Sequence, residues 1–325
     1  MLLRKGILLL SAFALAACGT STATSGDDLT KVVLKVGDQK GSQKALLTAA
    51  GLEKAPYKIE WSTFTSGPPL LEAASGGAID IGAVGNTPPI FAAAANAKIA
   101  IVSSARGNVT SDAILVPADS PLRTVQDLRG KTVGVAKGSS AHGQLLLTLK
   151  AASLSTKDIK QAFLQPSDAY AAFTQKRVDA WAIWDPYTSQ ALQEANARVL
   201  VDGTGTANGY TFEVAGRAAL ADAGKTAAIK DYVTRIAKAQ KWSDAHRTEW
   251  ATAWSADTGL AVKVTTAATA SGPDLPVALD DQLVGSEQQL ADAFTADGVL
   301  TSTVDFAAFV DKRYAADLQA ARSNP

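Results

Sequence analysis

The stretch AVGNTPPIFAAAA, residues 83–95, joins a short apolar run to an alanine-rich run through five turn residues. Gly85 permits a positive φ, and Asn86 or Thr87 can cap a helix by accepting a backbone N–H. Pro88 suits the first helical turn, where its missing N–H would have no partner anyway. Such a turn presents free N–H groups and the positive end of a helix dipole. Two interpretations follow: a well-capped helix start, or a seat for an anion.

Turns of the same kind recur along the chain. Runs typical of strands alternate with runs typical of helices, which favours an α/β fold. Four strand-to-helix turns carry small or polar residues, around Ser66, Asn86, Ser139 and Asp185. In open α/β sheets, ligands bind beyond the carboxyl ends of the strands, where such turns gather. The recurrence therefore favours an anion seat.

Two series of strand–helix units indicate two lobes that face one cleft. Pro117 and Pro121 mark the crossing from the first lobe to the second, and residues 211–215 mark the return crossing. We expect lobe 1 to comprise residues 31–118 and 216–325, and lobe 2 to comprise residues 119–215. Strands are expected at 32–36, 57–61, 79–84, 99–103, 113–116, 131–136, 160–164 and 179–183, and helices at 43–50, 70–75, 141–152 and from 167.

The C-terminal third is expected to be mostly helical. From about residue 220, Ile229, Val233, Ile236 and Ala237 recur at the spacing of one helix face. Four tryptophans are assigned to core packing: Trp181, Trp242, Trp250 and Trp254.

The N-terminus has the features of an export signal. Residues 1–17 combine a positive start with an apolar stretch too short to span a bilayer. The small residues before Cys18 resemble the lipobox of bacterial lipoproteins, which implies cleavage before Cys18 and a lipid on it. The alternative is an ordinary signal peptide with an incidental cysteine. Residues 18–30 are rich in Ser, Thr, Gly and Asp, as in a flexible tether. We therefore expect an exported protein, lipid-anchored on the extracytoplasmic face of a membrane.

Composition excludes several classes of protein. Cys18 is the only cysteine, so a disulfide framework is impossible. The formal net charge is zero and basic residues are scattered, so we expect no nucleic-acid partner. No second stretch is apolar for long enough to cross a membrane.

No cofactor, metal or catalytic motif stands out. The run Gly37–Ser42 is too short for a phosphate loop and lacks the Lys-Ser/Thr pair. The run Gly138–His142 has a serine near a histidine, but the second glycine of a nucleophile elbow is missing. A histidine two residues along a helix also points away from that serine. His142 and His246 are the only histidines, and neither belongs to a cluster of metal ligands. We expect a binding protein and not an enzyme, with no cofactor and no metal.

Three longer stretches carry a family resemblance: SGPPLLEAASGGAIDIGAVGNTPPIFAAA, DLRGKTVGVAKGSSAHGQLLLTL and SDAYAAFTQKRVDAWAIWDPY. In this order they resemble the aliphatic-sulfonate-binding proteins of bacterial ABC importers. The resemblance implies a two-lobed periplasmic-binding-protein fold of type II, with a hinged ligand cleft. It implies an extracytoplasmic, monomeric protein that delivers an organosulfonate to an ABC permease. Alternatives are taurine, nitrate, another small organic anion or a heterocycle as ligand, or an enzyme that makes a thiamine pyrimidine precursor.

The resemblance also implies which turns contact the ligand. Relatives often carry Asp at position 86, so Asn86 replaces a carboxylate by a neutral amide near the expected anion. Trp184 or Tyr210 is expected to cover the organic tail, and Asp185 either caps a helix or faces the ligand. The implied ligand-binding residues are Gln39, Ser66, Gly67, Pro68, Gly85, Asn86, Thr87, Ser139, Ser140, His142, Trp184, Asp185 and Tyr210.

A sulfonate suits such turns on physical grounds. The group is ionised at any physiological pH and carries no proton, so it needs only hydrogen-bond donors. Backbone N–H groups, hydroxyls and amides supply donors without burying a mobile cation. Each hydrogen bond to a charged group contributes about 1.5–3 kcal/mol, and micromolar affinity needs about 8 kcal/mol. A handful of such bonds is therefore sufficient.

Overall fold

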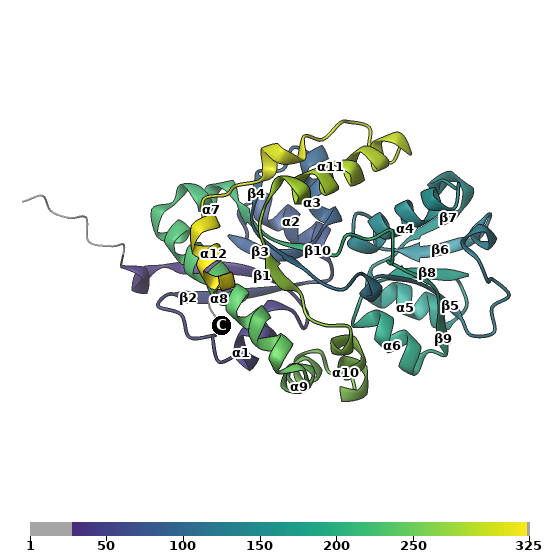
Figure 1. Ribbon diagram of the computed structural model, residues 1–325, viewed down its shortest axis with the longest axis horizontal. Helices are drawn as coiled ribbons and strands as arrows, with labels where there is room; N and C mark the ends of the chain where they lie inside the picture. The colour runs from purple at the N-terminus through teal and green to yellow at the C-terminus, as the bar shows by residue number, and fades with distance from the viewer. Residues whose placement is uncertain (1–27, 324–325) are drawn as a thin grey trace, which may run out of the picture.

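The computed structural model describes residues 28–323, which form two lobes, each built on one open β-sheet (Figure 1). The predicted signal peptide, Cys18 and most of the predicted tether lie outside the described residues. The first sheet contains β1 (Val33–Gln39), β2 (Lys58–Phe64), β3 (Ile81–Gly85), β4 (Ile99–Arg106), β10 (Tyr210–Gly216) and β11 (Leu275–Val277). The second contains β5 (Ala113–Pro117), β6 (Thr132–Val135), β7 (Lys160–Phe163), β8 (Ala180–Ile183) and β9 (Ala197–Asp202).

Each sheet is parallel at one side and antiparallel where the chain changes lobe. The orders are β11-β4-β10-β3-β1-β2 and β7-β6-β8-β5-β9. In the first sheet β1 is parallel to β2 and β3, whereas β10 is antiparallel to β3 and β4. In the second, β6 is parallel to β7 and β8, whereas β5 is antiparallel to β8 and β9. The α/β class and the two-lobed arrangement expected from the sequence are both observed.

The crossovers lie a few residues earlier than the sequence boundaries placed them. β5 hydrogen-bonds in the second sheet and β10 in the first, so the chain crosses at 107–112 and 203–209. The sequence division assigned β5 to lobe 1 and β10 to lobe 2. The sequence division placed the first boundary at residue 118 because of the nearby prolines. In the structure, Pro117 is the last residue of β5 and pairs with Ala197 of β9, so it does not begin a linker. The sequence also left β9 and β11 unassigned.

Helices connect the strands and cover the sheets. α1 to α3 belong to lobe 1, α4 to α6 to lobe 2, and α7 to α12 follow the return to lobe 1 (Figure 1). α2 begins at Gly67, three residues before the expected start, because its two prolines fit the first turn. The helices are α1 (Gln43–Ala49), α2 (Gly67–Ser75), α3 (Thr87–Ala94), α4 (Ser140–Ala151), α5 (Pro166–Thr174), α6 (Tyr187–Glu194), α7 (Arg217–Ala221), α8 (Ala223–Ala245), α9 (Arg247–Thr258), α10 (Val262–Ala270), α11 (Asp281–Ala296) and α12 (Ala315–Ser323). In residues 28–323, no helix combines the length and apolarity needed to cross a membrane.

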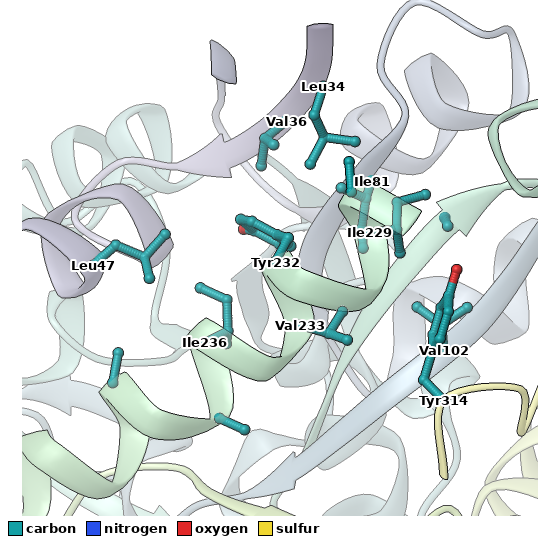
Figure 2. Packing of buried hydrophobic residues seen from close by; sticks show 14 of the residues in the cluster. Leu34, Val36, Leu47, Ile81, Val102, Ile229, Tyr232, Val233, Ile236 and Tyr314 are labelled. Carbon is teal, nitrogen blue, oxygen red and sulfur yellow. The ribbon is translucent and has the colours of Figure 1, made fainter. Parts of the chain in front are cut away.

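The core of lobe 1 lies between the sheet and α8. Figure 2 shows Tyr232 and Ile236 of α8 close to Val36 of β1 and Leu47 of α1, and all four side chains are buried. The face of α8 predicted from its helical spacing is therefore confirmed, since Ile229, Val233, Ile236 and Ala237 are all buried.

A second core cluster joins the two lobes beside the crossovers. Leu146 of α4, in lobe 2, is buried with Leu290 and Phe294 of α11, in lobe 1. Gly143 lets α4 approach α3 closely, since a Cβ there would lie 2.3 Å from the Thr87 hydroxyl. The lobes are thus in apolar contact on one side, and the ligand cleft opens next to this contact.

Candidate functional site

A cleft of about 440 Å³ lies between the lobes, and the six helices that follow β1, β2, β3, β6, β7 and β8 begin at it. The turns that follow β1, β2 and β3 reach it from lobe 1, and the turns that follow β6, β7 and β8 reach it from lobe 2. First-turn residues of these helices line it: Gln43, Gly67, Pro88, Ser140, Pro166 and Tyr187. The positive ends of six helix dipoles therefore surround one volume.

Most of the residues predicted from the family motif line this cleft. Nine of the thirteen do so: Gln39, Gly67, Gly85, Asn86, Ser139, Ser140, Trp184, Asp185 and Tyr210. Four do not line it: Ser66, Pro68, Thr87 and His142. The four lie behind the cleft wall, and three of them, Ser66, Thr87 and His142, are fully buried.

Side chains behind the wall hold the lobes together or support the lining. The Ser66 hydroxyl donates to Gln165 Oε1 in the other lobe at 2.9 Å. Pro68 faces the other lobe too, since a Cβ on Gly138 would lie 3.4 Å from its Cγ. The Thr87 hydroxyl donates to Asn86 Oδ1 at 3.0 Å. Ser66, Pro68 and Thr87 can therefore affect the cleft lining only through the residues that they contact.

His142 is a core histidine. Its Nδ1 accepts the Gly138 N–H at 3.1 Å, so its Nε2 carries the proton and donates to Gln161 Oε1 at 2.9 Å. The ring lies between Phe91 of lobe 1 and Phe163 of lobe 2, with centroids 5.7 Å from each. Burial lowers the pKa of His142 to about 4, so the ring is neutral. The structure does not place His142 in the cleft lining, because the first turn of α4 points its ring into the seam between the lobes.

The sequence indicated that Gly85 permits a positive φ, but the structure requires glycine there because the lobes approach each other closely. Its φ is not positive. A Cβ on it would instead lie 3.0 Å from Ser140 Cβ, across the cleft. Glycine therefore lets the end of β3 approach the start of α4.

Ser139 and Ser140 are neighbours with different tasks. Ser139 caps α4: its hydroxyl accepts the His142 N–H at 3.3 Å and donates to the Ala136 carbonyl at 2.7 Å. Ser140 lines the cleft, and its hydroxyl donates to Asp112 Oδ1 at 3.3 Å. Both serines belong to the cleft lining, and of the two only the Ser139 hydroxyl caps the helix.

Asp185 caps a helix at the cleft wall. Its Oδ1 accepts the Ser189 N–H at 2.8 Å in the first turn of α6, after a cis peptide bond to Pro186. Burial raises its pKa, and the hydrogen bond from Ser189 opposes that rise. Asp185 therefore combines the two expected positions: its carboxylate caps α6 and also lines the cleft.

Aromatic rings form one part of the wall. Trp184 meets Tyr187 edge to face at 6.3 Å, whereas Trp181 is fully buried as expected. Trp250 and Trp254 of α9 stack on each other at 5.3 Å and line the cleft. Assigning these two to core packing was incomplete, because the packing of α9 against α1 leaves part of both rings at the cleft.

Sequence reasoning missed the acidic part of the lining. Asp112 ends the first crossover, and Asp274 follows α10, where its Oδ2 accepts the Thr211 hydroxyl at 3.0 Å. Burial, reinforced by the charges of Asp185 and Asp274, raises the pKa of Asp112 to about 7 against the hydrogen bond from Ser140. Burial likewise raises the pKa of Asp274. Neither residue lies in a strand-to-helix turn, so the pattern that found the other turns could not find them.

Cations at the cleft are few. Of the described lining residues, Lys40 and Arg247 carry the positive side chains, and Arg247 is paired with Asp244 at 2.6 Å. Residues 28–323 contain no cluster of three or more histidine, cysteine or acidic side chains arranged to hold a metal. The polar groups of the lining are mostly neutral donors and buried carboxyls.

Comparison with known proteins identifies the family. The profile of the NMT1-like family matches residues 48–257. The chain belongs to the NMT1-like family. A protein named as a putative aliphatic sulfonates-binding protein of Escherichia coli (strain K12) is 44% identical over 216 residues. That match spans 65% of this chain and 65% of the relative's length. A Bacillus subtilis (strain 168) protein of the same name is 29% identical over 96% of both chains.

Solved structures give the same relationship for this NMT1-like chain. The alkanesulfonate-binding protein of Xanthomonas axonopodis pv. citri, bound to MOPS, superposes with a TM-score of 0.79 at 34% identity. The superposition covers 86% of this chain and 98% of that one. The resemblance to aliphatic-sulfonate-binding proteins and the expected periplasmic-binding-protein fold are therefore confirmed. The desulfurization enzyme DSZB shares the fold alone, at 16% identity and a TM-score of 0.61.

Proposed function

We propose that this protein captures an aliphatic sulfonate outside the cytoplasm and delivers it to an ABC permease. One observation carries the proposal: helix N-termini with no side-chain cap face the cleft from both lobes. α2, α3 and α5 have none, whereas Asp38, Ser139 and Asp185 occupy the N-termini of α1, α4 and α6. Pro68, Pro69, Pro88, Pro89 and Pro166 contribute no N–H to these first turns, so the backbone donors there are the N–H groups of Gly67, Thr87 and Ser167. Such N–H groups can donate to an oxyanion that carries no proton.

The rest of the lining suits an organic tail. Trp184 and Tyr187 present rings from lobe 2, and Trp250 and Trp254 present rings from lobe 1. Rings on both sides can enclose an alkyl chain as the cleft closes. Capture without catalysis is part of the proposal, and the binding-protein names of the relatives support it.

A second candidate ligand is an aminosulfonate such as taurine. The carboxyls of Asp112, Asp185 and Asp274 all line the cleft, and a carboxylate there would attract an ammonium group and repel a bare anion. Burial raises the pKa of all three carboxyls and raises that of Asp112 to about 7, so the negative charge of Asp112 is reduced at neutral pH, which favours the plain alkanesulfonate.

Isothermal titration calorimetry of the purified protein tests the function. Alkanesulfonates of increasing chain length should bind with micromolar or tighter dissociation constants, and nitrate and sulfate should bind weakly or not at all. The aromatic wall predicts that affinity rises with tail length. If nitrate binds best, or if no sulfonate binds, the proposed function is wrong.

Asp185→Asn separates the two candidate ligands. The asparagine keeps an oxygen that can accept the Ser189 N–H, so α6 stays capped while the carboxylate is removed. For an alkanesulfonate site, ethanesulfonate should bind equally or up to about ten-fold tighter, because the variant no longer repels the sulfonate. Two negative charges about 4 Å apart repel by on the order of a few kcal/mol, and protonation of the carboxyl reduces this repulsion. For a taurine site, taurine should weaken strongly and ethanesulfonate should not. Calorimetry with both ligands on both proteins distinguishes the two.

Ser139→Ala and Ser140→Ala form a matched pair on one turn. Removing the cap at Ser139 should lower the stability of the ligand-free protein by about 1 kcal/mol. Removing the Ser140 hydroxyl should leave stability nearly unchanged and weaken sulfonate binding by about 1–3 kcal/mol. Urea unfolding and calorimetry on both variants measure the two effects. Equal losses of stability would show that Ser140 serves the fold and not the ligand.

The lipid anchor is also a proposal, and it rests on the sequence around Cys18. The wild-type protein, expressed in a bacterial host, should partition into the detergent phase of a Triton X-114 extraction. Cys18→Ser should shift it to the aqueous phase or leave it uncleaved. Membrane retention of a correctly trimmed Cys18→Ser protein would contradict the anchor.

A further inference from the structure

A chain of hydrogen bonds runs from α11 through the second crossover to the cleft. Asn208 Nδ2 donates to Glu287 Oε1 at 2.7 Å and to the Ser286 hydroxyl at 3.0 Å. Asn208 Oδ1 accepts from Asn86 Nδ2 at 2.8 Å and from the Tyr210 backbone N–H at 3.2 Å. Asn208 thus uses both ends of its amide and links lobe 1 helix α11 to the start of α3.

The direction of this chain is fixed at Asn208. The Tyr210 backbone N–H can only donate, so the atom of Asn208 that faces it must be the oxygen. The opposite end of the amide must then be the NH2 group, and both of its protons are used by Glu287 and Ser286. The oxygen of Asn208 therefore faces Asn86 and requires a donor there.

Asn86 is oriented by Asn208 as a result. Its NH2 group faces Asn208 Oδ1, and its Oδ1 accepts the hydroxyl of Thr87, which is fully buried. One N–H of Asn86 has no further partner in residues 28–323, and Asn86 lines the cleft. Were the amide reversed, its oxygen would lie where this N–H is, and an oxygen repels an anion.

Glu287 performs this task without adding charge near the ligand. The side chain is fully buried, and its Oε2 has no hydrogen-bond partner in the part of the chain that the structure describes. Burial raises its pKa to about 8, against the hydrogen bond from Asn208, so the carboxyl is mainly neutral at pH 7. A neutral carboxyl still accepts the amide N–H through its carbonyl oxygen.

We propose that Glu287 and Asn208 are positioning residues of the ligand site, which hold the amide of Asn86 so that it donates to the sulfonate. This inference rests on the proposed function. Glu287 lies on α11, behind the cleft, and does not line it, so its effect on binding must pass through Asn208 and Asn86.

A double-mutant cycle, measured by calorimetry with hexanesulfonate, tests the relay of hydrogen bonds from Glu287 through Asn208 to Asn86. Asn86→Ala should weaken binding about ten-fold, as expected for one lost hydrogen bond to an anion. Glu287→Leu should weaken binding about ten-fold in the wild-type background and less than about two-fold in the Asn86→Ala background. Glu287→Gln, which keeps an acceptor for Asn208, should restore binding to within about three-fold of wild type. Ser286→Ala is the matched control and should change binding less than two-fold, because Glu287 still holds Asn208.

Each other outcome overturns the relay. Equal losses from Glu287→Leu in both backgrounds would mean that Glu287 acts on the fold in general. Unchanged binding in Glu287→Leu, with a wild type that binds hexanesulfonate, would reject the relay and leave the proposed function intact. A wild type that binds no sulfonate would reject the proposed function and the relay with it. If Glu287→Leu does not fold, Asn208→Ala removes the middle link and enters the same cycle.

Discussion

Replacing Gly85 by valine should abolish sulfonate binding in a protein that still folds. Gly85 ends β3 at the cleft, and a Cβ there would lie 3.0 Å from Ser140 Cβ and 3.3 Å from its hydroxyl oxygen. Valine adds two further methyl groups in the space between the lobes. Because the contact is between lobes, the protein can relieve it by opening the cleft instead of unfolding. We expect the dissociation constant to rise on the order of 100-fold or more, from overpacking of about 3 kcal/mol.

Two further variants complete this experiment. Gly85→Ala should give an intermediate loss, because its Cβ needs Ser140 to move only a few tenths of an ångström. Gly285→Ala, on α11, places its Cβ in open space and should leave binding unchanged. Calorimetry measures binding, and circular dichroism melting reports the fold. Tight binding by Gly85→Val would show that the cleft does not close at this contact.

Glu213→Gln should remove a large part of the pH dependence of stability. Glu213 lies in β10, one of the two central strands of its sheet, and neither of its carboxyl oxygens has a hydrogen-bond partner among the described residues. Burial, reinforced by the charge of Asp38, raises the pKa of Glu213 to about 8 from a usual 4.5. The neighbouring Tyr232, shown in Figure 2, is fully buried, and its hydroxyl has no hydrogen-bond partner in residues 28–323. Below about pH 8 the carboxyl is therefore protonated in the folded protein.

The sign follows from proton binding. Between pH 4.5 and 8 the folded state holds a proton on Glu213 that the unfolded state has lost, so the free energy of unfolding falls as the pH rises. At about 1.4 kcal/mol per pKa unit, the loss approaches 5 kcal/mol across this window. Below pH 4.5 both states hold the proton, and above pH 8 both lose it, so stability is flat there with respect to this group.

Urea unfolding of wild type and variants at pH 5, 6, 7 and 8 measures this slope. The difference between wild type and Glu213→Gln isolates Glu213 from other buried acids such as Asp38, Asp112 and Glu287. Glu60→Gln is the matched control: Glu60 is exposed and bonded to Lys58, which lowers its pKa, so it does not titrate in this window. Parallel pH curves for wild type and Glu213→Gln would show that Glu213 is ionised in the folded protein.

The turns that build the cleft could be predicted from the sequence because each is a local event. A β-rich run followed by Gly, Ser, Asn or Pro and then by a helical run determines both a strand end and a helix start. The turns around Ser66, Asn86, Ser139 and Asp185 were singled out in this way, and the structure has Asn86, Ser139 and Asp185 in the cleft lining and Ser66 behind it. The apolar face of α8 was equally local, since one helical period determines it.

Residues brought to the cleft by pairing between distant segments could not be predicted. Asp112 and Asp274 come from a crossover and from the loop before β11, and only the pairing of β11 with β4 brings Asp274 beside Thr211. Strand pairing also decided the lobe boundaries, because β5 and β10 look alike in sequence whichever sheet they join.

The sequence also could not predict the direction of each side chain at the start of a helix. Ser139, Ser140 and His142 lie within one turn, yet Ser140 lines the cleft, Ser139 caps α4 and His142 is buried between the lobes. The sequence by itself determined that these residues begin a helix after a strand. Only the tertiary structure decided that the two serines line the cleft and that His142 does not, because the angle between α4 and its neighbours α3 and α11 sets which face of the first turn is covered.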